Sequence, residues 1–418
     1  MFYSLFIFYF LIIGITLKKS SFFKNAEIPY YVLIGLFVLK VVAGLVYSHY
    51  FSFPNQIENA DTWNYFIESK AETDWLLSNP KAFAADLFAN HYSQTGNLFS
   101  CTNSFWNDLK TTFFVKLLAL LNLLSGKNYY INLLFFNAFF MFGGVAFYRL
   151  FKDNFIINKW LLLVIVFFTP SFLFWCSGIH KDGVIFSATA ISLFIFNKAL
   201  KDKFNIIRIF ILMLCFALIF LLRNYYLIAI IPAFVSWFIV EKTKLKVNIS
   251  FAVTTISCLL ILFFSSTLPI TKSICESIVQ KHDEFLTLDG NTKFQTPVLE
   301  AKVKSIISYF PFAMQSSLIR PFPNNIKSKG EFLAMMENYT FLIVLIMAVV
   351  KVFNKKNKIL NSPIILSCIL ISFFLLLFIG YTVCFNAAII RYRSVSFPLL
   401  IVPCIILIFG KLKHQLSN

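Results

Sequence analysis

Charged side chains are scarce in this sequence, and their scarcity excludes a soluble globular protein. Of the 418 residues, 13% are charged, 59% are hydrophobic and 54 are phenylalanine. A soluble chain of this length has no way to bury so much apolar surface. The composition therefore predicts an all-α polytopic membrane protein, a bundle of transmembrane helices forming a single integral membrane domain over residues 1–418.

Several motifs that define enzyme or metal-binding families are missing as well. The chain has no Cys-x-x-Cys pair, and its 5 histidines include no His-x-x-x-His spacing, which argues against a zinc site built by the protein. It has no Gly-x-x-x-x-Gly-Lys-Ser/Thr loop for nucleotide phosphates and no Gly-x-Ser-x-Gly nucleophile elbow. Neither an internal repeat nor a low-complexity linker is found.

The positive charge, in contrast, is abundant and follows the topology. The net charge of +18 does not indicate a nucleic-acid partner, because most Lys and Arg residues fall in short loops between apolar runs. About eleven such runs predict spans, several of them short for a hydrocarbon core of about 30 Å. They cover residues 2–17, 30–50, 129–149, 160–175, 184–199, 207–222, 225–240, 249–266, 339–353, 363–385 and 395–410.

Every second loop is basic, which predicts an outside N-terminus and a cytoplasmic C-terminus. Two of the loops that must then face outward are long. The first, Phe51–Lys110, carries seven Asp and Glu against three Lys, and its apolar residues recur at the spacing of short amphipathic helices on the membrane surface. The second, residues 267–338, is roughly neutral and polar.

The outer loops hold the residues that could carry chemistry. Asp61 follows the second predicted span among aromatic residues, where partial desolvation makes a carboxylate a better general base. Glu58 is a weaker candidate of the same kind. The alternative for Asp61 is the N-cap of a helix, where Asp is also favoured.

Cations also gather on this face, where the positive-inside rule predicts few. They lie beside apolar runs, as expected for side chains that bind the phosphate of a lipid. The alternative is contact with phospholipid headgroups. The cations are Lys181, Arg223, Arg320, Arg391 and Arg393.

The stretch from Ser177 to Gly183 places three ionisable residues between two apolar runs. Ionisable groups so close to hydrocarbon indicate a functional site by default, although a plain polar turn fits too. Here we expect His180 to orient a phosphate or to bond within the turn. We expect Lys181 to contact the phosphate and Asp182 to orient Lys181 or contact the sugar, with Gly178 and Gly183 as hinges of a tight turn.

Four stretches together resemble the GT-C class of membrane glycosyltransferases, which use polyprenyl-phosphate-linked sugars. The resemblance is spread over about residues 40–410. It rests on Ala60–Tyr65, on Thr169–Asp182, on Leu222–Tyr225 and on Arg391–Pro398.

The resemblance implies that Asp61 is the catalytic base and that the basic residues bind the phosphate of the donor. The acceptor is then a glycan, a lipid or a protein. The chain departs from the class by an apparent extra first span and by the lack of an Asp-x-Asp pair. No cofactor is assigned, and a divalent cation, Mg²⁺ or Mn²⁺, stays an open alternative.

Two other functions fit less well. An O-antigen-type polymerase or ligase also has many spans, long outer loops and outer arginines. A transporter or flippase is expected to show charges at the bilayer midplane and internal repeats, whereas only Lys40 lies clearly inside a span here. High usage of Phe, Ile, Lys and Asn suggests an AT-rich bacterial genome, so we expect a bacterial inner membrane with periplasmic outer loops.

Overall fold

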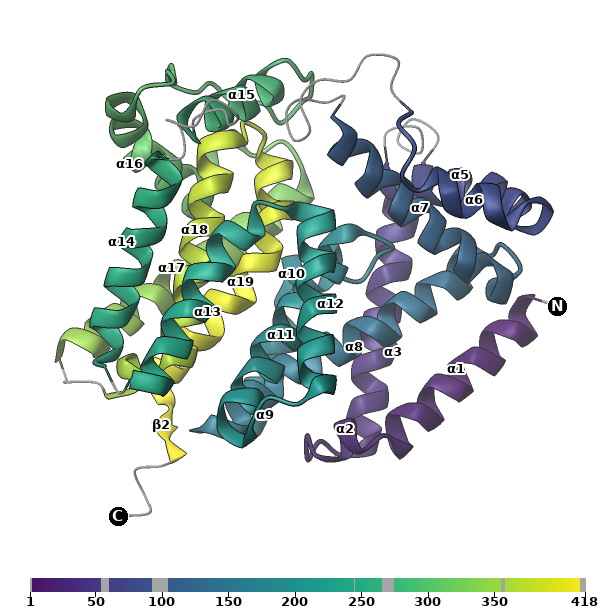
Figure 1. Cartoon of the computed structure of the whole chain (residues 1–418), viewed down its shortest axis with the longest axis horizontal. Helices are drawn as coiled ribbons and strands as arrows, with labels where there is room; N and C mark the ends of the chain where they lie inside the picture. The colour runs from purple at the N-terminus through teal and green to yellow at the C-terminus, as the bar shows by residue number, and fades with distance from the viewer. Residues whose placement is uncertain are drawn as a thin grey trace. The chain divides into compact units, whose positions relative to one another are not determined.

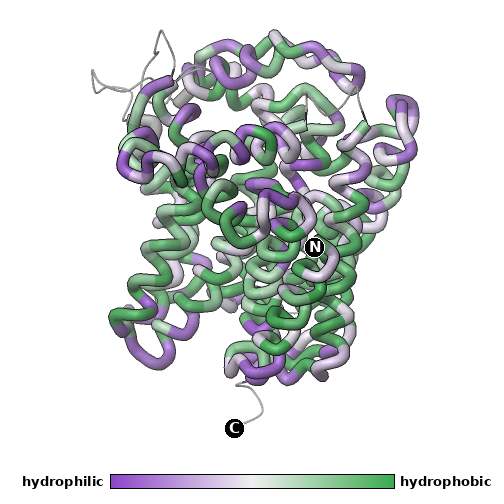
Figure 2. Tube along the Cα trace, turned by 90° about the vertical axis from the view of Figure 1, so that its right-hand side faces the viewer, coloured by the Kyte–Doolittle hydropathy of each residue, from purple (hydrophilic) through white to green (hydrophobic). Residues whose placement is uncertain are grey.

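The computed structural model describes residues 2–53, 60–91, 104–243, 245–264, 274–354 and 358–413. These residues are overwhelmingly helical, and the two short strands, β1 (Phe155–Ile156) and β2 (Lys411–Leu412), pair antiparallel. The expected all-α polytopic helix bundle is therefore confirmed. Figure 2 shows hydrophobic residues along the helices and hydrophilic residues concentrated near their ends, as a membrane protein requires.

The chain divides into two compact units. The first unit comprises residues 1–149, 172–195 and 210–223, and the second comprises residues 150–171, 196–209 and 224–418. The division falls inside four helices, α8, α10, α11 and α12, whose bounds follow. The expectation of one integral membrane domain over residues 1–418 stays a prediction.

Among the described residues, ten helices lie wholly or for the most part in the first unit. They are α1 (Phe2–Lys19), α2 (Ser21–Lys24), α3 (Tyr30–Tyr50), α5 (Asp61–Ser78), α6 (Pro80–Asp86), α7 (Phe105–Ser125), α8 (Tyr129–Asn154), α10 (Pro170–Trp175), α11 (Lys181–Asp202) and α12 (Ile206–Arg223). Figure 1 shows α5 and α6 lying across one end of α3. That end of α3 is where the indole Nε1 of Trp63 donates to the Ser48 carbonyl, at 3.1 Å.

The second unit contains the remaining elements. They are α9 (Lys159–Phe167), α13 (Tyr226–Thr243), α14 (Val247–Phe264), α15 (Ile274–Leu286), α16 (Val303–Ile319), η2 (Pro323–Asn325), α17 (Lys329–Asn354), η3 (Lys358–Asn361), α18 (Pro363–Thr382) and α19 (Asn386–Phe409), together with β1 and β2. Its core is formed by α18 and α19, which are buried along most of their lengths. Gly380 lets the backbone of α18 touch that of α16, because a Cβ there would collide with Ala313.

Nine of the described helices are long and apolar enough to cross a membrane: α1, α3, α8, α11, α12, α13, α17, α18 and α19. Of the about eleven spans expected from the sequence, one is corrected and one stays a prediction. The run at 249–266 lies in α14, of which Val247–Leu260 is a shorter apolar helix, and it ends outside the described residues, so this span stays a prediction. The run at 160–175 is broken into α9 and α10 at Phe168 and Thr169.

The break between α9 and α10 has a simple cause. Pro170 has no N–H for a helical hydrogen bond, and its ring disfavours the helical conformation of the preceding residue. The Thr169 hydroxyl donates to the Ile165 carbonyl at 2.8 Å. The hydroxyl thereby satisfies a carbonyl near the end of α9.

The acidic loop Phe51–Lys110 contains helices, as its periodicity predicted, but their buried face is partly polar. In α5 the buried residues are Thr62, Phe66, Ser69 and Thr73, while Ile67 and Leu77 are exposed. Asn122 of α7 donates to Ser69 Oγ at 2.9 Å and to Thr73 Oγ1 at 3.1 Å. The helices of this loop therefore pack on one another through a hydrogen-bonded stripe. Their location at the membrane surface stays a prediction.

Candidate functional site

The stretch between α10 and α11 is anchored from inside the first unit. Lys40 of α3 is buried, and its Nζ donates to the Cys176 carbonyl and to Ser177 Oγ, each at 3.1 Å. Asn137 of α8 donates to the Ser177 carbonyl at 2.8 Å. Side chains from two helices, α3 and α8, therefore hold this turn before the chain enters α11.

The two glycines of this stretch serve close packing. Neither has a positive φ, since Gly126 is the one described glycine that does. A Cβ on Gly183 would lie 2.5 Å from the Phe140 ring, and one on Gly178 would collide with the ring of Tyr47. The neighbouring rings leave no room for a side chain at either glycine, and the expectation that they act as hinges stays a prediction.

His180 and Asp182 are fully buried and bonded to each other. Imidazole Nδ1 of His180 lies 2.9 Å from Asp182 Oδ2, and both side chains are 0% exposed. The Asp182 backbone N–H also donates to Nδ1, at 3.2 Å. In the neutral imidazole Nδ1 therefore accepts, and it donates to the carboxylate only when the ring is protonated. Asp182 holds the imidazole in one orientation through both its backbone and its side chain.

Arg223 completes the pairing of the buried carboxylate. Its Nη2 donates to Asp182 Oδ1 at 2.6 Å, and its side chain is 11% exposed. A carboxylate without exposure needs such a partner, since its transfer out of water costs several kcal/mol. Lys181 and Asp182, expected in a turn, are the first two residues of α11. Arg223, the last residue of α12, thus binds a protein carboxylate rather than standing apart as a cation.

Asp61 reaches the same cluster from the start of α5. Its Oδ2 lies 3.3 Å from His180 Nε2, and the Asp61 side chain is 42% exposed. The N-cap of α5 is Ala60, so the alternative of Asp61 as an N-cap is not realised. Asp61 is held by its neighbours: Thr62 bonds the Tyr129 hydroxyl at 2.7 Å, and Trp63 stacks on the Tyr129 ring at 4.2 Å.

Four side chains therefore form a continuous line, Asp61–His180–Asp182–Arg223, which we call the polar relay. Its inner members are buried or nearly so, and its outer carboxylate meets solvent. With Nδ1 accepting from the Asp182 backbone, Nε2 of His180 carries the hydrogen and faces the Asp61 carboxylate as a donor. The relay can therefore take up a proton at its exposed end.

Lys181 lies outside the polar relay and reaches α5 at Tyr65, one helical turn after Asp61. The residue is buried, and its Nζ lies 4.5 Å from the ring centre of Tyr65 and 5.9 Å from that of Phe114. Its charge also acts on Glu68 of α5. The ammonium group therefore lies beside aromatic rings, which attract it through cation–π interactions.

The remaining predicted cations lie in the second unit. Arg393 of α19 is buried, and its Nη1 donates to the carbonyls of Ser317 at 3.0 Å and of Arg320 at 2.8 Å. Arg393 therefore secures the end of α16. Arg391 is half-buried, with its guanidinium 5.6 Å from the Tyr392 ring centre. Arg320 is buried beside two phenylalanine rings.

Two ionisable groups in helices long enough to span a membrane, the buried Lys40 and the half-buried Glu337, were not predicted as part of a site. Lys40 was visible as the ionisable residue inside a run, but its contact with the site depends on a turn 137 residues away. Glu337 of α17 lies just before the run expected at 339–353. Its carboxylate accepts from the Ser171 backbone N–H at 3.1 Å and from the Ser171 hydroxyl at 3.0 Å. An acidic residue so near an apolar run was the available signal.

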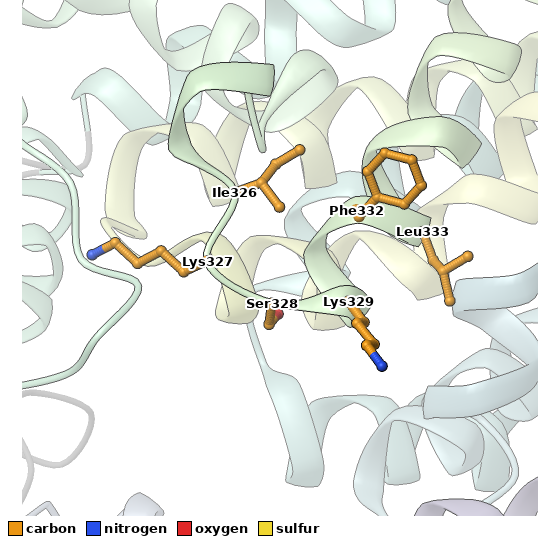
Figure 3. Close-up of a pocket in the computed structure, with 6 residues that line it drawn as sticks. All are labelled: Ile326, Lys327, Ser328, Lys329, Phe332 and Leu333. Carbon is orange, nitrogen blue, oxygen red and sulfur yellow. The ribbon is translucent and has the colours of Figure 1, made fainter.

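The remaining candidates from the sequence add no further residues to the polar relay. Glu58 lies outside the described residues. Within the described part of the chain, no group of three or more His, Cys, Asp or Glu side chains has the arrangement of a metal site. A surface pocket at the start of α17 is lined by Ile326, Lys327, Ser328, Lys329, Phe332 and Leu333 (Figure 3) and contains none of the predicted residues. Its Lys327 Nζ donates to the Asn291 carbonyl at 2.5 Å.

The fold and the relay together define an integral membrane protein with a solvent-accessible carboxylate held by buried charges. No known family model, curated protein or solved structure matches the chain. The function therefore has to be argued from the chemistry of the polar relay and its surroundings.

Proposed function

We propose that the protein is a membrane glycosyltransferase that moves a sugar from a polyprenyl-phosphate donor to a hydroxyl of a glycan, lipid or protein acceptor. We place the reaction on the outer, periplasmic face of a bacterial inner membrane. The observation that carries the proposal is the half-exposed Asp61 carboxylate at the end of a buried relay. A general base needs both access to its substrate and a fixed orientation.

In this mechanism Asp61 accepts the proton of the acceptor hydroxyl while the hydroxyl oxygen attacks the anomeric carbon. The bond between that carbon and the phosphate oxygen breaks, and polyprenyl phosphate leaves with the bonding electrons. A direct displacement of this kind inverts the anomeric centre. Lys181 stabilises the charge that develops on the departing phosphate.

The inner relay residues act as positioning residues. His180 orients the Asp61 carboxylate, since its Nε2 is 3.3 Å from that carboxylate. Asp182 and Arg223 keep that imidazole in one tautomer and one orientation. A requirement for Mg²⁺ or Mn²⁺ stays open, and activity measured with EDTA and with each metal restored decides it.

The test is substitution of the base. Asp61→Asn and Asp61→Ala should lower transfer from a labelled polyprenyl-phosphate sugar in isolated membranes by about a hundredfold or more, because general-base catalysis contributes that much. Asp74→Asn is the matched control, since Asp74 lies on the same helix, is 68% exposed and pairs with Lys127. Expression is compared by immunoblot of the membrane fraction.

Full activity in both well-expressed Asp61 variants would remove this carboxylate from the mechanism. Loss of activity in Asp74→Asn to the same extent would show that the assay reports on the α5 segment rather than on its base. The Asn variant matters most, because it preserves the shape of the side chain while removing its basicity.

A second candidate is an O-antigen-type polysaccharide polymerase or ligase. It is favoured by Arg320, a buried cation in the second long outer loop. The two candidates differ in their products. A single-sugar transferase yields an acceptor longer by one residue, whereas a polymerase yields a ladder of chain lengths and a ligase transfers a preformed glycan.

A further inference from the structure

A second cluster of charged side chains in the first unit shares no residue with the polar relay. It joins the end of α6 to α7 through two cationic groups, the imidazole of His91 and the ammonium of Lys116. None of its members lies in a helix that is long and apolar enough to cross a membrane. Water and its pH therefore reach this cluster more readily than they reach the interior of the bundle.

Both ring nitrogens of His91 face carboxylates. Nε2 lies 3.0 Å from Oδ1 of Asp86, the last residue of α6, and Nδ1 lies 2.9 Å from Oδ2 of Asp108, in the first turn of α7. An ionised carboxylate only accepts hydrogen bonds, so each contact needs a hydrogen on the ring nitrogen. A neutral imidazole carries one such hydrogen and an imidazolium carries two. The geometry is therefore that of a protonated His91.

The charges around His91 come from three helices. Among the described residues, Asp86 of α6 and Asp108 of α7 act on the imidazole directly. Beyond them, Lys116 of α7 lies 2.9 Å from Asp86 Oδ2 and 2.8 Å from the carboxylate of Glu72 in α5. The hydrogen bond to Asp86 raises the pKa of His91 above its usual value of 6.5, partial burial opposes the rise, and the bond to Asp108 adds to it.

The two carboxylates differ in what else holds them. Asp108 has a side chain that is 9% exposed, and its Oδ2 also accepts from the His91 backbone N–H at 2.7 Å, a bond that does not depend on the ring proton. Asp86 is 17% exposed and keeps Lys116 as a second partner. Losing the imidazole bond therefore costs less at Asp86 than at Asp108, so the last ring hydrogen stays on Nδ1.

Helix α6 is short enough for one contact at its end to matter. It has seven residues, of which Phe83 is buried. The Phe83 ring packs against Trp75 of α5 and lies with its centre 4.1 Å from the Lys116 ammonium. A helix of two turns with little buried apolar surface is marginally stable, so a bond that comes and goes with pH changes its population measurably.

We propose that His91 is a pH-dependent latch that fastens the end of α6 to the start of α7. While the imidazole is protonated, it donates to Asp86 and to Asp108 at once and the latch is closed. After deprotonation Nε2 presents a lone pair to Asp86, so two acceptors face each other, and the end of α6 opens while Nδ1 keeps its bond to Asp108. The latch goes beyond the proposed transferase activity, because it uses no relay residue and works whether or not sugar is transferred.

The test follows α6 in the full-length protein in detergent micelles. A nitroxide spin label is attached at Ala84→Cys, an exposed position on α6, in a variant lacking the 8 native cysteines. Its electron paramagnetic resonance spectrum separates an immobilised from a mobile population. Between pH 5.5 and pH 8.5 the ratio of mobile to immobilised label should rise by about threefold to tenfold, the factor that corresponds to one ordinary hydrogen bond. The midpoint should lie above pH 6.5.

Two substitutions remove the latch from opposite sides. His91→Gln removes the titrating group, and the label ratio should then stay near its alkaline value at every pH. Asp86→Asn removes the carboxylate that the imidazolium binds, and most of the pH dependence should disappear. His49→Gln is the matched control, since His49 is an exposed histidine of the same unit at the end of α3, and it should leave the titration unchanged.

Each outcome decides for or against the latch. A label ratio that is constant with pH in the protein with native His91 overturns the proposal, as does a label that is more mobile in acid or a midpoint at or below pH 6.5. A titration that persists in full in His91→Gln assigns the change to another group and overturns it too. Should one of the two latch variants not fold, the other decides alone. Because the readout is the mobility of α6, the latch and the transferase activity fail or succeed separately.

Discussion

At the scale of single residues, the central feature is a buried carboxylate between an imidazole and a guanidinium. Asp182 contacts His180 at 2.9 Å and Arg223 at 2.6 Å. The sequence predicted these residues as contacts of the substrate or, for His180 and Asp182, of the turn and of Lys181, but not as partners of one another. Their residue types near apolar runs identified them, but their pairing could not be read from the chain, because Asp61 and His180 are 119 positions apart.

The same limit applies to the second unit. From the sequence, Arg320 and Arg393 were both predicted to be cations on the outer face with the same role, binding of a lipid phosphate. The structure distinguishes the two residues. Nη1 of Arg393 donates to two backbone carbonyls, whereas Nε and Nη1 of Arg320 have no hydrogen-bond acceptor among the described residues. This difference depends on the backbone carbonyls at the end of α16. Every residue has such a carbonyl, so the sequence does not show which ones are free to accept a hydrogen bond.

A pH dependence of stability follows from His282. Burial lowers the pKa of this imidazole below its usual value of 6.5. The unfolded chain therefore binds the proton more readily than the folded one, so stability falls as the pH drops below about 6.5. We expect the melting temperature in detergent to decrease between pH 7.5 and 5.5. In His282→Asn the decrease should be smaller, although the variant starts less stable.

His91 provides a control, because its pKa shift and therefore its effect on the pH dependence of stability have the opposite sign. A hydrogen bond to Asp86 raises its pKa, with a further bond to Asp108. Its stabilising contribution is present at acidic pH and disappears as the pH rises through the raised pKa. His91→Asn should therefore steepen the acid loss. An acid loss that is unchanged in His282→Asn would contradict the assignment.

At the scale of elements, α3 supports the site with one face. Lys40 and Gly44 are one turn apart, and both meet the turn that precedes α11. A Cβ on Gly44 would lie 2.5 Å from the Ser177 carbonyl and 2.9 Å from Leu133 Cδ1. A hydrocarbon side chain at this position is therefore incompatible with the present packing of the turn.

Gly44→Ala should accordingly destabilise the protein by about 1–3 kcal/mol, the usual cost of overpacking. Gly35→Ala on the same helix is the matched control, since a Cβ on Gly35 would meet nothing within 4 Å. Thermal unfolding in detergent measures both. Equal melting temperatures for the two variants would show that the contact between α3 and the turn contributes little.

Element boundaries show what apolar periodicity can and cannot predict. The runs at 30–50 and 363–385 form α3 and α18 with nearly the expected bounds. An uninterrupted apolar run in a helical membrane protein satisfies its backbone hydrogen bonds by forming one continuous helix. The helix expected to start at residue 184 begins at Lys181 instead. Its first residues are charged and bonded to partners from other helices, so hydropathy alone does not detect them.

At the scale of the whole molecule, the predicted orientation of the chain is open to a direct test. Alternating basic loops place Ser78, at the end of α5, outside and Lys203, between α11 and α12, inside. In a variant lacking all 8 native cysteines, Ser78→Cys should react with a membrane-impermeant maleimide in intact cells. Lys203→Cys should react only after the membrane is permeabilised.

Both positions are exposed in the folded protein, so access of the reagent depends on the membrane side. Labelling of Lys203→Cys but not of Ser78→Cys in intact cells would place Asp61 in the cytoplasm. Transfer from a donor on the outer face would then be ruled out, whatever the activity of the Asp61 variants.

The bond between Lys40 and the turn at Cys176 has a consequence for synthesis of the chain. The two residues are 136 positions apart. At roughly 5–20 residues per second, about 7 to 27 seconds pass between translation of the lysine and of its acceptor. During that interval α3 carries an ammonium group without its final partner. The packing of α3 is therefore completed only after the turn that follows α10 has been synthesised.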